Sequence, residues 1–426
     1  KSIKRMPREF ISIIRGERFD GRTSRVRSEK KHVDYSNTLI SELRNSKRVV
    51  SYQNERFFVP PHKRYERMIH SAILSKGNPS NAICLRRAGE AKDQTPDAVN
   101  VIKWSPSGDR VITAQKDGSV LMWNGKAFNF ITKTTIHSGP IRTMEWNHAG
   151  DILLTGDNSG ELKFSDAQLG TKHQDNIGGP DEKAVRCVSW SPNDSFFAAG
   201  SDDHTLRVFD SRTVSDVICI KDHHREVVCC DWHHSSSLLL AGDKNNLIRL
   251  WDIRAKPSSP SSGSSSLEHS FENVHTFQNG HKGQVTVVRW NRNGNWFLSA
   301  ARDNLLFLWD IRMMKSIQKF SGHDKHINAA AWHPFHEKLF VSGGFDGKMC
   351  YWIAGQDTMA AEYKRAHKMC IWHMDWHPLG HVLATCSKSG TSRFWVRNKP
   401  GDTIHDDRLL DAHVDQEIMD DDLDYD

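Results

Sequence analysis

The sequence lacks long apolar runs. Its mean hydropathy is −0.61, and no apolar run approaches the ~18 residues that a membrane-spanning helix needs. The opening stretch "KSIKRMPREF" is basic, but the apolar segment of a signal peptide does not follow it. We therefore expect neither a membrane span nor a secretion signal in these 426 residues.

The sequence also lacks the spacings that mark metal and catalytic sites. Its eight cysteines form no CxxC pair, and most lie in strand-like runs such as "VRCVSW" and "VVCCDW". We expect these to be buried free thiols in a reducing compartment. The 24 histidines include a dense cluster, "DHHREVVCCDWHH", but no HExxH pair. We find no phosphate-binding glycine loop or nucleophile elbow, so we expect no cofactor, no small-molecule substrate and no enzymatic activity.

Charge is unevenly distributed along the chain. The formal net charge is +6, yet the first fifty residues hold fourteen Lys and Arg against six Asp and Glu. The basic residues gather in "RFDGRTSRVRSEKKHVDY", residues 18–35, whereas the tail "DQEIMDDDLDYD" is acidic. A basic arm on a near-neutral body indicates a polyanionic partner. A solvated leader explains the charge equally well.

Seven tryptophans recur in one local setting, each after a short apolar run and before a turn. Their spacings are 42, 44, 42, 58, 42 and 44 residues, and a second aromatic follows each by eighteen to twenty. A period of about 40–45 residues with several short strands per unit is typical of WD repeats. The two series are Trp104, Trp146, Trp190, Trp232, Trp290, Trp332 and Trp376, and Trp123, Phe164, Phe209, Trp251, Trp309, Trp352 and Trp395.

The repeat predicts an all-β fold, a closed seven-bladed WD-repeat β-propeller over residues 81–399. A Ser/Pro-rich loop at 256–270 explains the long interval. Residues 83–87, "ICLRR", are expected to form the outermost strand of blade seven. A basic, partly helical extension occupies 1–80, and an acidic tail occupies 400–426.

Some blades carry a His, Ser, Asp and Trp that resemble a catalytic constellation. Blade five offers His281, Ser299, Asp303 and Trp309, and blade six has the same four residue types. Because the set recurs in more than one blade, we interpret it as a hydrogen-bonded brace for turns.

Several stretches go beyond the generic repeat. They include "FDG" followed by "KKHVDY", "LMWNGKAFNF", "NGNWFLSAARD", "WHPFHEKLFVSGGFDG" and "WHPLGHVLATCSKSGTSRFWVRNKPGD". With these motifs, nearly the whole chain resembles the WD-repeat subunits of the cleavage and polyadenylation specificity factor. That resemblance implies a nuclear, non-catalytic scaffold subunit that helps to bind the A/U-rich polyadenylation signal of pre-mRNA. It implies two protein partners, a large β-propeller scaffold subunit and a small CCCH zinc-finger subunit.

The resemblance also implies an RNA site shared by the basic arm and one face of the propeller. Cations and aromatic rings suit the phosphates and bases of single-stranded RNA. The positions that match RNA-contacting family positions are Phe19, Arg22, Arg25, Lys30 and Phe130, with Lys92 and Gln94, in the segment before blade one, matching less securely.

Three departures from the family pattern leave the RNA motif open. Thr23 and Ser24 interrupt the basic cluster, Ile131 replaces an acidic residue, and Lys133 replaces an apolar one. An alternative is a protein-only recruiter, such as a ubiquitin-ligase substrate receptor or a splicing scaffold. Phe19 would then anchor a partner protein, Phe130 would pack an outer strand, and the arginines would pair with an acidic subunit. Apolar and aromatic residues within 1–75 predict a clamp on a scaffold partner under the leading hypothesis.

Overall fold

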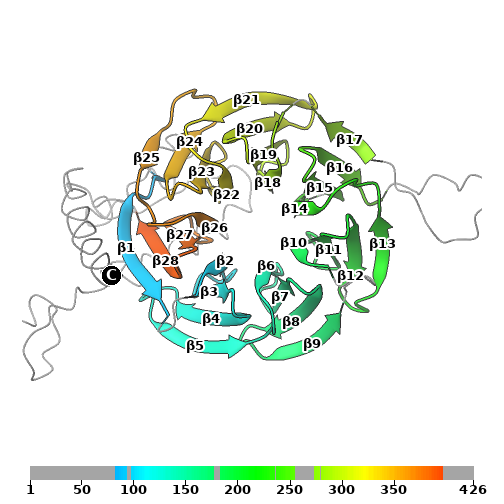
Figure 1. Cartoon of the computed structure of the whole chain (residues 1–426), viewed down its shortest axis with the longest axis vertical. Helices are drawn as coiled ribbons and strands as arrows, with labels where there is room; N and C mark the ends of the chain where they lie inside the picture. Colours follow the sequence, from blue (N-terminus) through cyan, green and yellow to red (C-terminus); the bar gives the residue numbers. More distant parts are fainter. Residues whose placement is uncertain are drawn as a thin grey trace, which may run out of the picture.

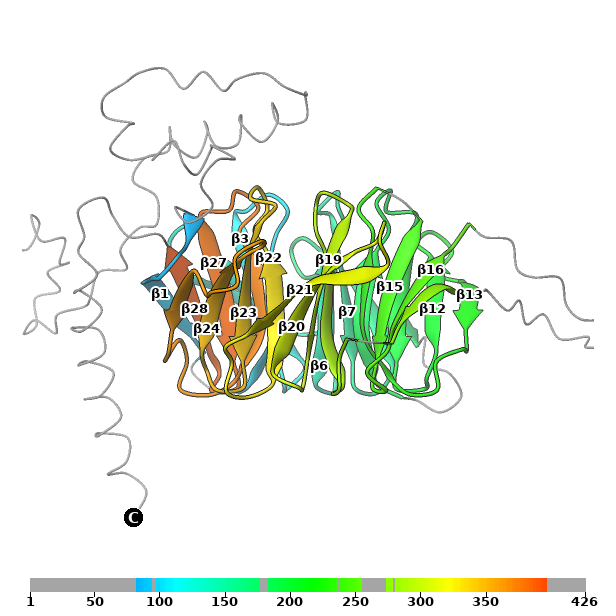
Figure 2. The same cartoon turned by 90° about the horizontal axis from the view of Figure 1, so that it is seen from above.

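The computed structural model describes residues 82–93, 97–176, 183–235, 237–254, 273–278 and 280–396. In this part of the chain, 28 strands form seven four-stranded antiparallel sheets. Figure 1 shows the sheets as blades arranged in a ring, and residues from all seven blades line the central channel. The side view in Figure 2 shows all seven blades lying in one layer. The predicted all-β, seven-bladed propeller is therefore confirmed.

Each blade contributes one strand to each of four concentric rings. The innermost strands are β2 (Val99–Trp104), β6 (Ile141–Trp146), β10 (Val185–Trp190), β14 (Val227–Trp232), β18 (Val285–Trp290), β22 (Ile327–Trp332) and β26 (Ile371–Trp376). The second strands are β3 (Arg110–Gln115), β7 (Ile152–Asp157), β11 (Phe196–Ser201), β15 (Leu238–Asp243), β19 (Trp296–Ala301), β23 (Leu339–Gly344) and β27 (Val382–Ser387). The first tryptophan series thus ends the seven innermost strands.

The two outer rings complete the blades. The third strands, which carry the second aromatic series, are β4 (Ser119–Asn124), β8 (Glu161–Asp166), β12 (Leu206–Asp210), β16 (Ile248–Asp252), β20 (Leu305–Asp310), β24 (Met349–Ile353) and β28 (Thr391–Val396). The outermost strands are β5 (Phe130–Thr135), β9 (Thr171–Asn176), β13 (Asp216–Ile220), β17 (Asn273–Phe277), β21 (Lys315–Ser321), β25 (Ala361–Tyr363) and β1 (Arg86–Lys92).

The core lies between blades rather than within one. Successive side chains of a strand point to opposite faces of the sheet. Because the inner strands have apolar residues at successive positions, such as Val111 and Ile112, both faces of a blade are apolar. Ile112 of blade one, for example, belongs to one buried cluster with Met144 and Trp146 of blade two. A blade cannot bury both faces alone, and the ring supplies a neighbour for each.

Blade seven closes the ring with a strand from the start of the propeller. β1 pairs with β28, from Arg86 opposite Val396 to Lys92 opposite Thr391. The prediction of an N-terminal closing strand was right, but its bounds of 83–87 were wrong, because the strand begins at Arg86 and continues to Lys92. Residues 82–85 instead pack against blade six, where the Tyr351 hydroxyl donates to the Cys84 carbonyl at 2.7 Å.

Histidines in the turns after three of the innermost strands link neighbouring blades. His377 Nδ1 accepts the Leu379 N–H at 3.0 Å, so Nε2 carries the proton and donates to the Gly108 carbonyl of blade one at 3.1 Å. The Trp104 N–H also donates to the Asp375 carboxylate, at 2.8 Å. These bonds tie blade seven to blade one independently of β1.

Seven of the eight cysteines are buried, and Cys219 is half-buried. All eight are free thiols, as predicted. The described residues contain no helix long and apolar enough to cross a membrane. The basic extension (1–80), the Ser/Pro-rich loop (256–270), the acidic tail (400–426) and the predicted clamp within 1–75 lie outside the described residues.

Candidate functional site: an outer edge and a channel rim

Phe130 lies on the outside of the ring where blade one meets blade seven. It begins β5, its side chain is 53% exposed, and its ring contacts Trp123 edge-to-face at 5.7 Å. Ile131 beside it is 48% exposed. Large apolar side chains that stay in water on an outer strand are available to a ligand. Of the predicted site residues, the structure describes this one and Lys92.

A neighbouring aromatic fixes this edge. Phe128 is buried and stacks on Phe394 of blade seven, with ring centroids 3.9 Å apart. Gly89 in β1 leaves the room, since a Cβ there would lie 2.9 Å from the Phe128 ring. The "AFNF" motif thus has one ring in the blade junction and the other exposed on the surface.

Lys133, three residues along β5, connects this edge to the adjoining turns. Its Nζ donates to Asp93 at 2.8 Å and lies 3.3 Å from the Asp117 carboxylate. The bond to Asp93, outweighing burial, raises the pKa of Lys133. Lys92, in the segment that precedes blade one along the chain, is exposed at the end of β1, the outermost strand of blade seven. We call Lys92, Phe130, Ile131 and Lys133 the junction edge.

The other predicted RNA-contacting residues are not placed. Phe19, Arg22, Arg25, Lys30 and Gln94 lie outside the described residues. Their association with Phe130 stays a prediction.

The predicted turn braces are confirmed in blades five and six. In blade five, His281 Nε2 bonds the Ser299 hydroxyl at 2.7 Å, and Trp309 Nε1 donates to the same oxygen at 2.8 Å. His281 Nδ1 donates to Asp303 at 3.1 Å. Blade six repeats the arrangement, with distances of 2.8 Å from Ser342 to both His323 and Trp352. In each blade the buried serine hydroxyl is bonded to both the histidine and the tryptophan. We therefore interpret these four residues as a structural brace and not as a catalytic site.

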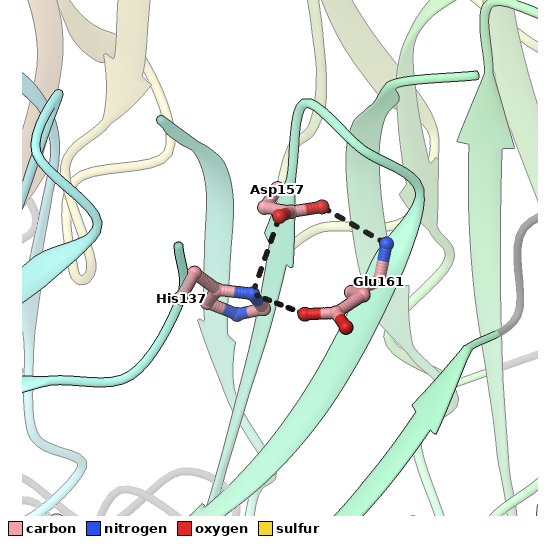
Figure 3. A group of neighbouring side chains, drawn as sticks. All are labelled: His137, Asp157 and Glu161. Carbon is pink, nitrogen blue, oxygen red and sulfur yellow. Dashed lines mark hydrogen bonds and ion pairs between the residues drawn. The ribbon is translucent and has the colours of Figure 1, made fainter. Parts of the chain in front are cut away.

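Blade two holds a group that resembles a metal site (Figure 3). Ligand atoms of His137, Asp157 and Glu161 lie within 4.8 Å of one another. The Lys163 ammonium lies 3.0 Å from Glu161, and the Ser159 hydroxyl donates to Asp157 at 2.6 Å. Although burial opposes it, the His137 ring at 3.6 Å and the hydrogen bond from Ser159 lower the pKa of Asp157 to about 2. Protein groups already compensate both carboxylates, so we assign this group to the brace of blade two.

The channel has a second set of functional candidates, which the sequence did not single out. We call the end where the innermost strands begin the rim, and the other end the far end. In every blade, the residue after the second strand donates its backbone N–H to the residue just before the innermost strand. We call these seven equivalent residues the rim positions; in blades one to seven they are Lys116, Asn158, Asp202, Lys244, Arg302, Phe345 and Lys388.

The far end is charged but internally paired. Arg289 donates to Asp231 at 3.3 Å, and Lys103 lies 3.7 Å from Glu145. Burial, partly offset by Arg289, raises the pKa of Asp231 to about 6. The channel contains a cavity of about 250 Å³, and its lining residues include Arg142, Arg186 and Arg302.

Comparison with known proteins decides the family. Six stretches match the WD40 model, described as WD domain, G-beta repeat: 91–124, 172–210, 215–252, 271–310, 314–352 and 361–396. The chain belongs to the WD40-repeat family. Each WD40 match begins near an outermost strand and ends with the third strand of the next blade. Residues 125–171, which include most of blade two, are unmatched, yet they form β5 to β8 with ordinary WD40 pairing.

Three relatives of this WD40 chain carry the same name. A polyadenylation factor subunit 2 from Candida albicans is 29% identical over 342 residues, which is 74% of this chain and 60% of that protein. The Neurospora crassa protein of that name is 30% identical over 354 residues (76% and 51%), and the Aspergillus fumigatus one 31% over 356 (77% and 62%). The predicted resemblance is thus confirmed. The chain spans about half to three fifths of the length of these relatives.

Proposed function

We propose that this chain is a non-catalytic scaffold and RNA-recognition subunit of the nuclear machinery that cleaves and polyadenylates pre-mRNA. The exposed Phe130 ring at the junction edge is the structural observation that carries the proposal. Its support is the similarity to proteins named polyadenylation factor subunit 2 over about three quarters of the chain. A WD40 propeller is a rigid platform, and function lies in the sites placed on it.

The junction edge offers the chemistry that an A/U-rich RNA signal requires. Aromatic rings stack on bases whatever their sequence, and exposed cations attract phosphates. Phe130 would stack one base, and Lys92, exposed at the end of β1, would attract a phosphate. Arg22, Arg25 and Lys30 of the basic arm would contact the phosphates, with Phe19 as a second stacking ring and Gln94 as a hydrogen-bonding neighbour. A CCCH zinc-finger subunit would complete the site, and a large propeller scaffold subunit would hold residues 1–75.

The test is RNA binding by the assembled complex with Phe130→Ala. Because Phe130 is more than half exposed, the variant should fold normally and should lose about 1–3 kcal/mol of binding free energy for A/U-rich RNA, with little change in salt dependence. Val217→Ala is the matched control, since Val217 is 51% exposed on an outermost strand of blade three. Unchanged binding by Phe130→Ala would remove the junction edge from the RNA site.

The arm is tested separately with Arg22→Ala and Arg25→Ala together. Each lost phosphate contact should lower the slope of log affinity against log salt by about 0.7. The protein-only recruiter predicts instead that both the arm and Phe130 variants bind RNA like the wild type. Those variants would then lose a protein subunit, which co-purification of the complex would reveal.

A further inference from the structure

We propose that the rim of blades five, six, seven and one binds a second stretch of the same RNA, beyond the signal held at the junction edge. We call the four rim positions Arg302, Phe345, Lys388 and Lys116 the rim arc. They belong to blades five, six, seven and one, which are consecutive around the ring (Figure 1). This inference rests on the proposed function and extends it to RNA flanking the signal.

The rim arc carries cations without partners. Among the described residues, the side chains of Lys116, Arg302 and Lys388 make no hydrogen bond or ion pair, and all three are exposed. Aspartates follow three of the four rim-arc positions, but each is bonded within its own blade. Asp303 pairs with His281, Asp346 with His323, and Asp117 with Ser119 and Lys133. The positive charge of the rim arc is therefore directed to solvent.

The remaining rim positions show the opposite behaviour. Asp202 holds Arg186 through two parallel bonds of 2.8 and 2.6 Å. Lys244 donates to Glu226 at 3.0 Å, and Asn158 accepts from Arg142 at 3.1 Å. Blades two, three and four thus satisfy their rim side chains internally. The side chains at equivalent rim positions are therefore paired in blades two, three and four, whereas the cations of blades five, seven and one are unpaired within the described part of the chain.

An aromatic surface lies in the middle of the rim arc. Phe345 is 37% exposed, its ring lies 4.4 Å from that of His326, and Lys325 Nζ is 5.9 Å from its centroid. Burial, with the positive charges of Arg302 and Lys325, lowers the pKa of His326. A base can stack on a ring flanked by cations that meet its phosphates.

The junction edge leads directly to the rim arc. Lys133 of the junction edge lies 3.3 Å from Asp117, the residue next to the rim-arc position Lys116. An RNA strand could leave Phe130, follow β5 to Lys116 and continue over blades seven, six and five. Towards the channel, two buried donors in the cavity lining, Asn328 Nδ2 and Trp372 Nε1, have no partner among the described residues.

Single-stranded RNA fits this surface better than an acidic peptide does. Both would neutralise the cations, but only a nucleic acid provides planar bases for Phe345 and His326 together with phosphates for Arg302 and Lys388. The continuity with the junction edge also favours a strand that is already bound there. The rim arc therefore predicts an affinity that grows with RNA length.

The experiment compares two A/U-rich RNAs bound to the assembled complex. One has about 8 nucleotides, within the range of single-strand binding sites, and the other extends the same sequence to about 30. In the wild type the longer RNA should bind more tightly. Phe345→Ala should weaken the longer RNA about tenfold and leave the shorter one unchanged. Arg302→Ala with Lys388→Ala should lower the salt slope of the longer RNA by about 0.7 per residue.

Lys244→Ala is the matched control, because it removes the same charge from a rim position that is already paired with Glu226. It should leave both RNAs unaffected. If the rim-arc variants bind the longer RNA like the wild type, or if a polyglutamate peptide binds the rim arc while RNA length has no effect, the proposal is wrong. Loss of the short RNA in Phe130→Ala tests the junction edge separately, so the two failures are distinguishable.

Discussion

The charges at the far end of the channel are paired with one another, whereas, among the described residues, the cations of the rim arc are not. At the far end, Arg289 faces Asp231 at 3.3 Å and Lys103 faces Glu145 at 3.7 Å. At the rim, Arg302 and Lys388 are exposed with no acidic partner among the described residues. Two arginines of one blade, Arg289 and Arg302, therefore have different electrostatic surroundings.

The effect of a charged side chain in a propeller therefore depends on which groups the neighbouring blades place beside it. A cation opposed by an acid from a neighbouring blade stabilises the ring or its folding specificity. A cation left unopposed creates a field outside the molecule and attracts a ligand. Three measurements test this contrast, and they are given in order of decreasing expected effect.

Arg289→Ala should destabilise the protein by about 2–3 kcal/mol, because it leaves the Asp231 carboxylate buried without its cation. Arg302→Ala in the same blade should change stability by less than about 0.5 kcal/mol. Urea unfolding of both variants measures the difference. Equal losses would show that the two channel ends do not differ in how they hold charge.

Acid should weaken the turns of the far end. His333 Nδ1 accepts the His336 N–H at 3.0 Å and its Nε2 donates to Gly380 at 3.0 Å, so the ring must be neutral. Burial, together with the positive charge of His336, lowers the pKa of His333 to about 3. The unfolded chain binds the proton below about pH 6.5, so the stability is present above that pH and is lost as pH falls.

We expect His333 to account for about 2 kcal/mol of lost stability between pH 7 and pH 5. His333→Asn, which cannot titrate, should flatten the pH dependence of unfolding, whereas the exposed His224→Asn should not. A pH dependence that is identical in His333→Asn and in the wild type would contradict this assignment.

The smallest effect concerns the rim turns. Blade four has Ala241 where blade five has Ser299. As a result, His223 Nε2 and Trp251 Nε1 are buried without a hydrogen-bond partner in the described structure. Ala241→Ser should supply the missing hydroxyl and raise stability by about 1 kcal/mol.

Ser299→Ala is the mirror control in blade five. It removes the oxygen shared by His281 and Trp309 and should cost about 2 kcal/mol. Thermal unfolding of the two variants should therefore show a gain of stability for Ala241→Ser and a loss for Ser299→Ala. A destabilised Ala241→Ser would mean that blade four has repacked around its alanine.

Most of the fold was predictable because each WD repeat contains its own pair of recurring aromatic residues. The paired aromatics located all seven blades, including blade two, which the family model does not match. Phe164 replaces a tryptophan there and Thr155 replaces a serine, yet His137 still bonds the Thr155 hydroxyl at 2.9 Å. The predicted bounds of the closing strand were displaced by a few residues because "RRAGEAK" has no β-branched or aromatic residue, the types that favour strands. Only pairing with β28 identifies them.

The candidate site was less predictable. Phe130 could be named from the "AFNF" motif, but its exposure depends on Phe128 filling the junction with blade seven. Lys133 could be noted as a departure, whereas its bond to Asp93 required β1 to run beside blade one. The rim arc was missed because each of its residues is an isolated turn position in the sequence.

The number of blades, the two series of recurring aromatic residues and the turn braces could be predicted from the sequence alone. They depend on spacing along the chain and on contacts within one repeat. Only the tertiary structure decided which charges are opposed. Arg186 meets Asp202 while Arg302 meets no acid among the described residues, and Arg289 reaches Asp231 from the next blade. Pairing of this kind depends on closing the ring in three dimensions, and no pattern along one repeat contains it.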